Sequence, residues 1–144
     1  MKKIFTLSAL LIAATVILTS CYKRNDYVFD EGYWLSQERG IVVYSSGDCS
    51  YYVVETYNGY SVLHSADGYL PYEGAVVYGN FSGIGTRDFY NYSNRTLMTA
   101  RVQEYWLSYY DAQDAIDYYC GYYGKGTKEA KKINKAGLAQ ESKQ

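Results

Sequence analysis

The residues best suited to chemistry on a partner molecule lie close together between positions 87 and 92. They combine one guanidinium fork with three aromatic rings: Arg87, Phe89, Tyr90 and Tyr92. Such rings stack on sugars or grip a partner protein, because stiff aromatic side chains lose little entropy on contact. We therefore predict these four residues as a candidate ligand-binding site. The alternative is that the rings only cover the end of the domain, since the chain holds 20 tyrosines.

Two carboxylates and one imidazole are the remaining candidates for catalysis. Asp88 and Glu104 are the pair we consider for a polysaccharide-acting enzyme. A small barrel without a large cleft rarely holds two carboxylates at the separation that this reaction needs. His64 is the one imidazole of the chain, and no serine or cysteine around it has a recognisable nucleophile motif. We predict that the protein is not an enzyme.

Metal and phosphate sites are not favoured either. Asp111, Asp114 and Asp117 follow one another at intervals of three, but no loop with EF-hand spacing surrounds them. The glycines around Ile84 and Lys125 lack the spacing of a phosphate-binding loop between a strand and a helix. We predict no metal and no cofactor.

The first 21 residues have the layout of an export signal. Two lysines precede the apolar residues 4–18, a run too short for a membrane-spanning helix, which needs about 20 apolar residues. The run ends in Leu18-Thr19-Ser20-Cys21, which resembles the lipobox of bacterial lipoproteins. The resemblance implies cleavage before Cys21, lipid on its sulfur and an acyl chain such as palmitate on its new amine. The alternative is an ordinary signal peptide whose cleavage site adjoins a cysteine.

The resemblance also implies a place and a first partner for the protein. A lipid on Cys21 anchors it to a membrane of the cell envelope. Tyr22 stands where lipoproteins retained in the inner membrane carry Asp, so the resemblance favours the outer membrane, on its periplasmic or surface face. An envelope protein or a glycan is the expected second partner.

Two cysteines remain once Cys21 carries lipid. Exported compartments are oxidising, so we predict a disulfide between Cys49 and Cys120. The alternative, a thiol nucleophile, lacks the nearby base or positive charge that lowers a thiol pKa.

Charge is unevenly distributed along the chain. Residues 22–124 hold six Lys or Arg and thirteen Asp or Glu, a net charge of 6 − 13 = −7. Residues 125–144 hold six Lys and two Glu, a net charge of 6 − 2 = +4. An acidic body disfavours nucleic acid as a partner, because binding to the phosphate backbone needs a basic face. The last 20 residues have little to bury, so we predict a mobile basic tail.

Hydrophobic alternation predicts five strands. They cover residues 40–44, 51–57, 60–65, 75–81 and 96–106. Asn58-Gly59 separates the second from the third and predicts a two-residue hairpin turn, in which Val54 faces Leu63 in a buried row. The other face, with Glu55 and His64, is predicted to be solvated. Residues 82–94 are predicted as a long loop, or as a loop plus a ragged strand.

The pattern then changes to a helical period. Ala112, Ala115, Ile116 and Tyr119 fall on one helical face. We predict a short helix that starts at a capping box at residues 111–114, stops at Gly121 and packs on the sheet.

These elements predict a mainly β protein, a small five-stranded OB-like barrel with a short C-terminal helix. Residues 40–105 resemble small exported bacterial OB-like domains in the first strand, the cysteine in the next turn, the hairpin and a Leu-Pro connection. The predicted organisation is a signal peptide (1–20), a tether (21–32), the OB-like domain (33–124) and the basic tail (125–144).

Three functions remain open at this stage. The first is a lipid-anchored, non-enzymatic binding or envelope module. The second is an inhibitor or immunity-type lipoprotein whose acidic body covers a basic partner protein. The third, and least favoured, is the polysaccharide-acting enzyme.

Overall fold

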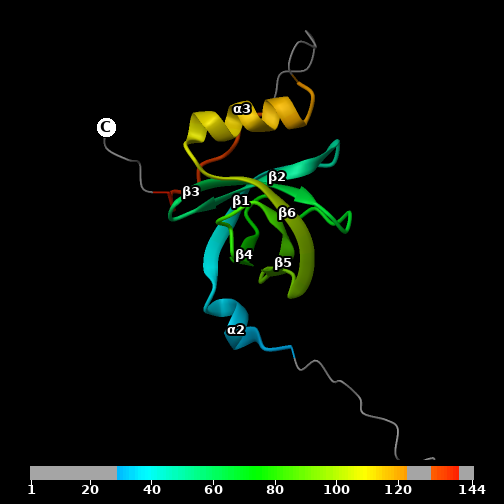
Figure 1. Cartoon of the computed structure of the whole chain (residues 1–144), viewed down its shortest axis with the longest axis vertical. Coiled ribbons are helices and arrows are strands. Elements are labelled where there is room, and N and C mark those ends of the chain that lie inside the picture. The colour runs from blue at the N-terminus through cyan, green and yellow to red at the C-terminus, as the bar shows by residue number, and fades with distance from the viewer. Residues whose placement is uncertain (1–28, 123–130, 140–144) are drawn as a thin grey trace, which may run out of the picture.

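A computed structural model describes residues 29–122 and 131–139 of the chain. A closed β-barrel forms its body, with the short helix α2 at one end and the helix α3 across the other (Figure 1). The helices are α2 (Glu31–Leu35) and α3 (Tyr109–Tyr119). The strands are β1 (Glu38–Ser46), β2 (Cys49–Thr56), β3 (Gly59–Ser65), β4 (Val76–Gly79), β5 (Gly85–Asn91) and β6 (Thr96–Leu107).

The prediction of a mainly β barrel with a short C-terminal helix is confirmed, but the barrel has six strands rather than the five predicted. The strands close in the order β1-β2-β3-β6-β5-β4, and every neighbouring pair is antiparallel. The chain therefore makes two three-stranded meanders whose outer strands pair with each other. The additional strand is β5, in the region predicted as a loop or as a loop plus a strand, and the second alternative is confirmed.

The β2–β3 hairpin forms, but its register differs from the predicted one. Thr56 pairs with Gly59, and Tyr52 rather than Val54 lies opposite Leu63. The turn residues are therefore Tyr57 and Asn58, and of the three residues from 57 to 59 only Gly59 has a positive φ, at 126°. The shift amounts to two residues, so each side chain keeps its predicted face of the sheet.

One core fills the barrel. The interior of the barrel buries Val54 and Leu63 as predicted, together with the inward side of β6. Met98, Ala100 and Val102 alternate inward along that strand, which confirms the predicted half-buried pattern.

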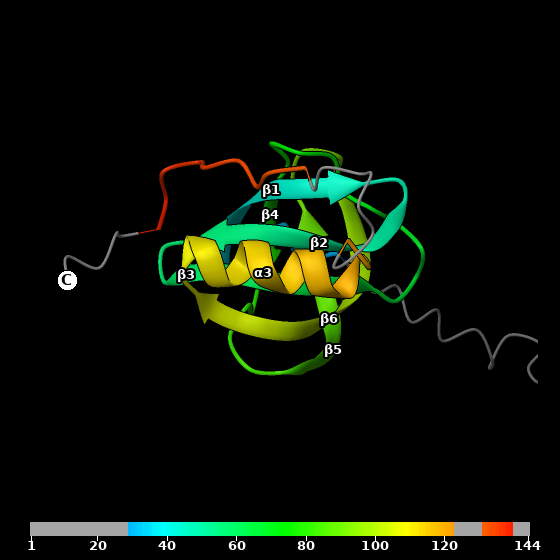
Figure 2. The same ribbon diagram turned by 90° about the horizontal axis from the view of Figure 1, so that it is seen from above.

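A second core lies on the outer face of β1, β2 and β3, beneath α3 (Figure 2). It contains Val53 and Val62 from the sheet and Ile116 from α3. The prediction of a solvated face is wrong: Glu55 is 1% exposed, and His64 is half-buried with its ring against Tyr51. The face is covered because a helix packs on it, which strand alternation alone does not reveal.

Helix α3 has the predicted buried face but an earlier start. Ala112, Ala115 and Ile116 are buried. Ser108 is the N-cap, because its hydroxyl accepts the N–H of Asp111, so the helix cap lies three residues before the predicted one. The helix ends at Cys120, whose sulfur is bonded to Cys49, and the predicted disulfide is confirmed.

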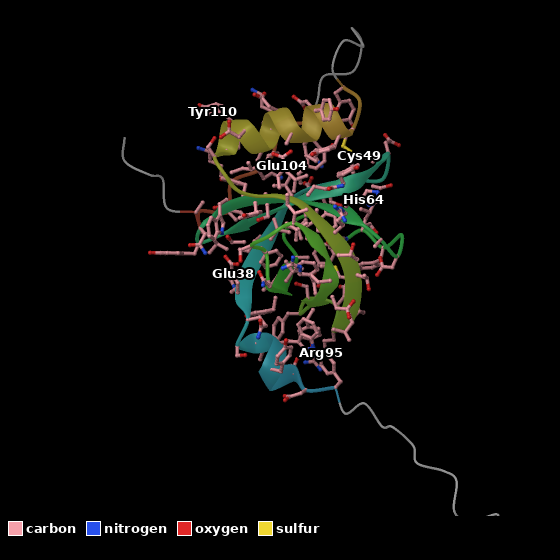
Figure 3. The ribbon with its side chains drawn as sticks, viewed as in Figure 1. Glu38, Cys49, His64, Arg95, Glu104 and Tyr110 are labelled. Atoms are coloured by element: carbon pink, nitrogen blue, oxygen red, sulfur yellow. A yellow bond between two sulfur atoms is a disulfide. The ribbon has the colours of Figure 1, made fainter. Side chains whose placement is uncertain are left out.

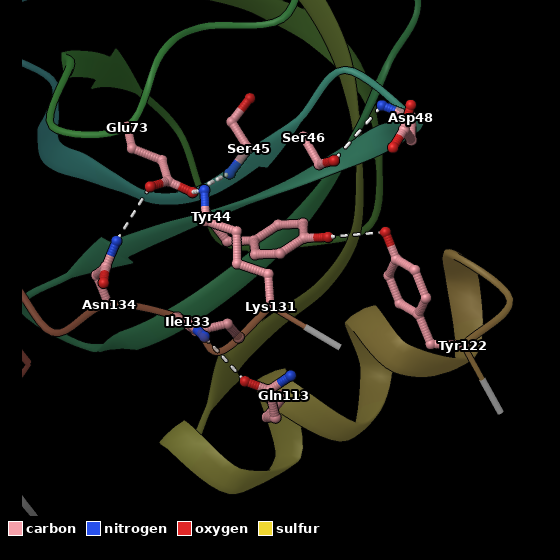
Figure 4. A network of polar contacts seen from close by, with 10 residues as sticks. All are labelled: Tyr44, Ser45, Ser46, Asp48, Glu73, Gln113, Tyr122, Lys131, Ile133 and Asn134. Atoms are coloured by element: carbon pink, nitrogen blue, oxygen red, sulfur yellow. Dashed lines mark hydrogen bonds and ion pairs between the residues drawn. The ribbon is translucent and has the colours of Figure 1, made fainter. Parts of the chain in front are cut away.

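Residues 131–139 lie against the barrel, unlike the mobile segment predicted there. Ile133 is buried in the second core and donates its N–H to Gln113 at 2.9 Å. Asn134 donates its N–H to the Val43 carbonyl at 2.9 Å and its amide group to Glu73 (Figure 4). We call residues 131–139 the C-terminal strap.

Glu55 holds the far end of the strap. Its carboxylate accepts the backbone N–H groups of Ala136, Leu138 and Ala139 at 2.5–2.9 Å. A buried carboxylate needs such donors, because an unpaired buried charge costs several kcal/mol. Glu55 therefore ties the far end of the strap to the sheet face.

The predicted lipid site, signal peptide and most of the tether lie outside the described residues, as do residues 125–130 and 140–144 of the predicted tail. The last residues of the predicted tether, from Phe29 on, are described and lead into α2. Among the described residues, no helix is long and apolar enough to cross a membrane.

Candidate functional site

The four predicted site residues do not form one exposed surface. Arg87 closes the turn that precedes β5, where its guanidinium donates to the carbonyls of Ser82 at 3.1 Å and Gly83 at 2.7 Å. Phe89 is fully buried, stacked on Phe81 with ring centroids 5.1 Å apart. Arg87 thus organises its own loop, and Phe89 contributes to the barrel core.

Tyr90 and Tyr92 belong to the end of the barrel where α2 lies. Tyr90 is 1% exposed, and its hydroxyl donates to Glu31 of α2 at 2.7 Å. This hydrogen bond, together with burial, raises the pKa of Tyr90 above its usual value. Tyr92 is 44% exposed, with its ring edge-on to Tyr90 and Tyr78.

Aromatic rings from three segments surround Tyr90. Phe29 packs on it at 4.9 Å, and Trp34 of α2 lies 6.4 Å away. Tyr33 is edge-on to Trp34 and 56% exposed. We call this surface the α2-end cluster, whose members are Phe29, Tyr33, Trp34, Tyr78, Tyr90 and Tyr92. The cluster shows bare ring surface at one pole of the molecule.

Exposed rings also gather near the start of α3, and we call this second group the helix-end cluster. Its members are the highly exposed Tyr57, Trp106 and Tyr110, which are 61%, 57% and 78% exposed. The three segments adjoin one another, because the turn residue Gly59 lies against the backbone of Trp106 and Tyr60 pairs with Leu107. Figure 3 places Tyr110 at the opposite end of the molecule from α2.

Trp106 has an unusual backbone. Its φ of 58° is in the left-handed region, which bulky side chains rarely adopt. This conformation coincides with a register shift in the pairing of β3 with β6, at which Tyr105 and Trp106 both stand opposite Ser61. Bulges of this kind redirect a side chain, and here Trp106 is 57% exposed with its ring edge-on to Tyr105. The sequence carried no signal for this conformation.

The predicted catalytic pair is not assembled into a site. Asp88 accepts the hydroxyl of Thr99 at 2.7 Å on the barrel surface. Glu104 accepts the hydroxyl of Tyr119 at 2.9 Å. Burial and this bond raise the pKa of Tyr119 to about 12. Each carboxylate thus serves a local contact.

Metal ligands do not converge in the part of the chain that the structure describes. There, no group of three or more His, Cys, Asp or Glu side chains is placed to hold an ion. Asp111 is engaged with the N-cap Ser108, and Asp117 accepts the side-chain amide of Gln113.

Comparison of the chain with protein-family models, with curated proteins and with solved structures found no match. The two aromatic clusters are therefore the surface features that bear on function.

Proposed function

We propose that the protein is a lipid-anchored, non-enzymatic protein of the cell envelope, which binds a partner protein through the helix-end cluster. Lipid on Cys21 supplies the anchor, and the residue that follows it favours the outer membrane. The single observation that supports recognition at the helix end is the conformation of Trp106.

The backbone of Trp106 has a positive φ, yet more than half of the residue's surface stays exposed. A left-handed conformation at a bulky residue costs on the order of 1–3 kcal/mol. Within the protein, the indole lies edge-on to the Tyr105 ring with centroids 5.2 Å apart, and the residue stays 57% exposed. Exposed Trp and Tyr are the residues that dominate binding energy in protein interfaces. The strain therefore fits a side chain that is held ready for a partner.

The surroundings of Trp106 suggest the chemistry of that partner. Asp111 and Asp114, on the first turns of α3, are exposed beside the cluster. The wider body is acidic, with a net charge of −7 over residues 22–124. A partner with an aromatic-accepting pocket and a basic rim would complement this surface. This keeps an inhibitor or immunity-type role as one form of the same function.

A direct test compares Trp106, which lies near the start of α3, with an exposed aromatic residue at the far end of α3. Trp106→Ala should lower recovery of an envelope partner at least tenfold in quantitative pulldown, as expected for an interface anchor. Tyr118→Ala is the matched control, because Tyr118 is 70% exposed but sits at the other end of α3. Equal recovery of the same partner by both variants, with unchanged melting temperatures, would place recognition elsewhere.

The anchor is tested separately. The mass of the N-terminal peptide should show lipid on Cys21, and Cys21→Ser should abolish that mass and the normal processing. A Cys21→Ser protein that is processed and membrane-bound like the wild type would contradict the anchor.

A further inference from the structure

We propose that the α2-end cluster lies in the head-group region of the membrane, so that the barrel stands on the bilayer with its helix end facing away. This inference rests on the proposed lipid anchor at Cys21. It adds an orientation, a contact surface and a lipid partner that the anchor alone does not specify.

The described chain begins at the α2-end cluster. Phe29 opens the described chain and is itself a member of the α2-end cluster, packed on Tyr90. Only 29 − 21 = 8 residues separate it from Cys21. Even fully extended, eight residues reach about 29 Å. The cluster is therefore the part of the described molecule that an anchor on Cys21 keeps nearest to the membrane.

The exposed rings of this end have the chemistry of a membrane interface. Phe29, Tyr33 and Tyr92 are each 44–56% exposed, and Leu97, which pairs with Tyr90 between the neighbouring strands β5 and β6, is 51% exposed. Tyrosine and tryptophan concentrate at membrane interfaces, because their rings are apolar while their polar tips stay hydrated. A mixed surface of this kind matches the head-group boundary.

Charged groups at this end also fit a lipid surface. Two described carboxylates, those of Asp30 and Glu31, are engaged within the protein: Asp30 accepts the N–H of Tyr33, and Glu31 accepts the hydroxyl of Tyr90. Arg95 is exposed and lies at the same end of the barrel (Figure 3). Its guanidinium can donate to lipid phosphates, as arginine does to phosphate groups in general. The surface therefore offers a donor to phosphate beside its rings.

The lipid already supplies attachment, so the cluster would set orientation. Two or more acyl chains hold a protein stably on a bilayer, whereas a flexible link leaves the domain free to tumble. Contacts between one pole and the head groups would remove this freedom. The helix-end cluster would then be presented outward to a partner.

The chain carries its own reporters for a test, because its two tryptophans stand at opposite ends. Trp34 belongs to the α2-end cluster and Trp106 to the helix-end cluster. The full-length processed protein is reconstituted in phosphatidylcholine–phosphatidylethanolamine vesicles whose acyl chains carry bromine close to the head groups. Trp106→Phe leaves Trp34 as the reporter, and Trp34→Phe leaves Trp106.

The expected result is that brominated lipid lowers the Trp34 emission at least twofold and leaves the Trp106 emission within a tenth of its value. Tyr33→Ser combined with Tyr92→Ser should reduce the Trp34 quenching at an unchanged melting temperature. Tyr118→Ser, the control on α3, should not change it.

The outcomes separate this proposal from the anchor. Vesicle flotation and the mass of the Cys21 peptide report the anchor on the same samples. If the protein floats and carries lipid but Trp34 is not quenched, or Trp106 is quenched as strongly, the orientation is wrong and the anchor stands. If the protein carries no lipid and does not float, the anchor fails and this inference fails with it.

Discussion

The two aromatic ends of the barrel are built in different ways. On the side of the barrel that α3 covers, a disulfide ties the far end of α3 to β2, a buried carboxylate holds the strap, and a close backbone contact joins the β2–β3 turn to the Trp106 segment. At the α2 end, the rings rest on a five-residue helix without a single buried residue, held mainly by ring contacts and by the Tyr90–Glu31 hydrogen bond. A rigid surface suits recognition of a shaped protein partner, whereas a lightly held surface suits a deformable lipid surface.

Removing the disulfide should have the largest effect on this comparison. Cys49→Ala with Cys120→Ala opens a 71-residue loop, which costs about 4 kcal/mol of unfolding free energy in the chain-entropy model. Urea unfolding measures the loss. Hydrogen exchange should rise in α3 more than in α2. Equal changes in both helices would show that the bridge does not serve the helix end in particular.

Replacing Glu55 by Gln should have the next largest effect. The amide keeps one acceptor but turns an NH₂ group toward donors of the strap, so one or more buried N–H groups lose their partner. We expect a loss of about 3 kcal/mol in urea unfolding, with faster exchange at Ala136, Leu138 and Ala139. Glu38→Gln is the control, since Glu38 accepts one exposed bond from Asn58 and should change stability by less than about 0.5 kcal/mol. A similar loss of unfolding free energy in both variants would show that Glu55 has no special role in linking the strap to the sheet.

A third substitution tests the contact between the hairpin turn and β6. A Cβ on Gly59 would lie 2.8 Å from the Leu107 carbonyl oxygen, and φ is 126°. Gly59→Val should therefore cost about 2 kcal/mol or more in thermal or urea unfolding. Gly68→Val is the control. Gly68 also has a positive φ, of 80°, but a Cβ there would have no neighbouring atom within 4 Å. If the two variants lose equal stability, backbone strain accounts for the effect and the contact with β6 does not.

At the α2 end, removal of one hydroxyl should have a small effect. Tyr90→Phe deletes the bond to Glu31 and should lower the unfolding free energy by about 1 kcal/mol. Hydrogen exchange should rise in α2 and stay unchanged in α3. Tyr92→Phe is the control, and protection of α2 that survives Tyr90→Phe would show that the rings alone hold this helix.

The last predicted effect is a change of stability at alkaline pH, with none at neutral pH. The folded pKa of Tyr119 is about 12, above the usual value of about 10 for tyrosine. Protonated Tyr119 therefore stabilises the fold fully below pH 10, and this contribution is lost as pH rises from 10 to 12. Tyr119→Phe should flatten the decline of stability over that window. An unchanged alkaline profile would mean that other groups cause the decline.

Local periodicity predicted much of the fold. The buried face of α3, the inward side of β6 and the Cys49–Cys120 bridge follow from spacing, helical period and compartment. The hairpin was predicted in the wrong register, because Asn58-Gly59 fits two kinds of turn. The pairing with Gly59 at the strand start depends on its fit against β6, which is distant in sequence.

The sites were harder to predict because they depend on distant segments. The position of Glu55 in its strand predicts that it faces solvent. The N–H groups that its carboxylate accepts belong to residues 136, 138 and 139, which follow it by 81, 83 and 84 positions. The sequence predicts Tyr90 as part of a ligand-binding surface, but its hydroxyl is bonded to Glu31 of α2. Trp106 takes its conformation from a bulge, and no residue type in the sequence predicts that bulge.

The central claim is that the two ends face different partners, and photo-crosslinking in living bacterial cells tests it most directly. Benzoylphenylalanine replaces Tyr33 in one full-length protein and Tyr110 in another, both being exposed positions. After irradiation, mass spectrometry identifies the adducts. We expect lipid adducts at position 33 and one discrete protein adduct at position 110, lost on Trp106→Ala. The same protein adduct at both positions, or lipid at position 110, would contradict the account.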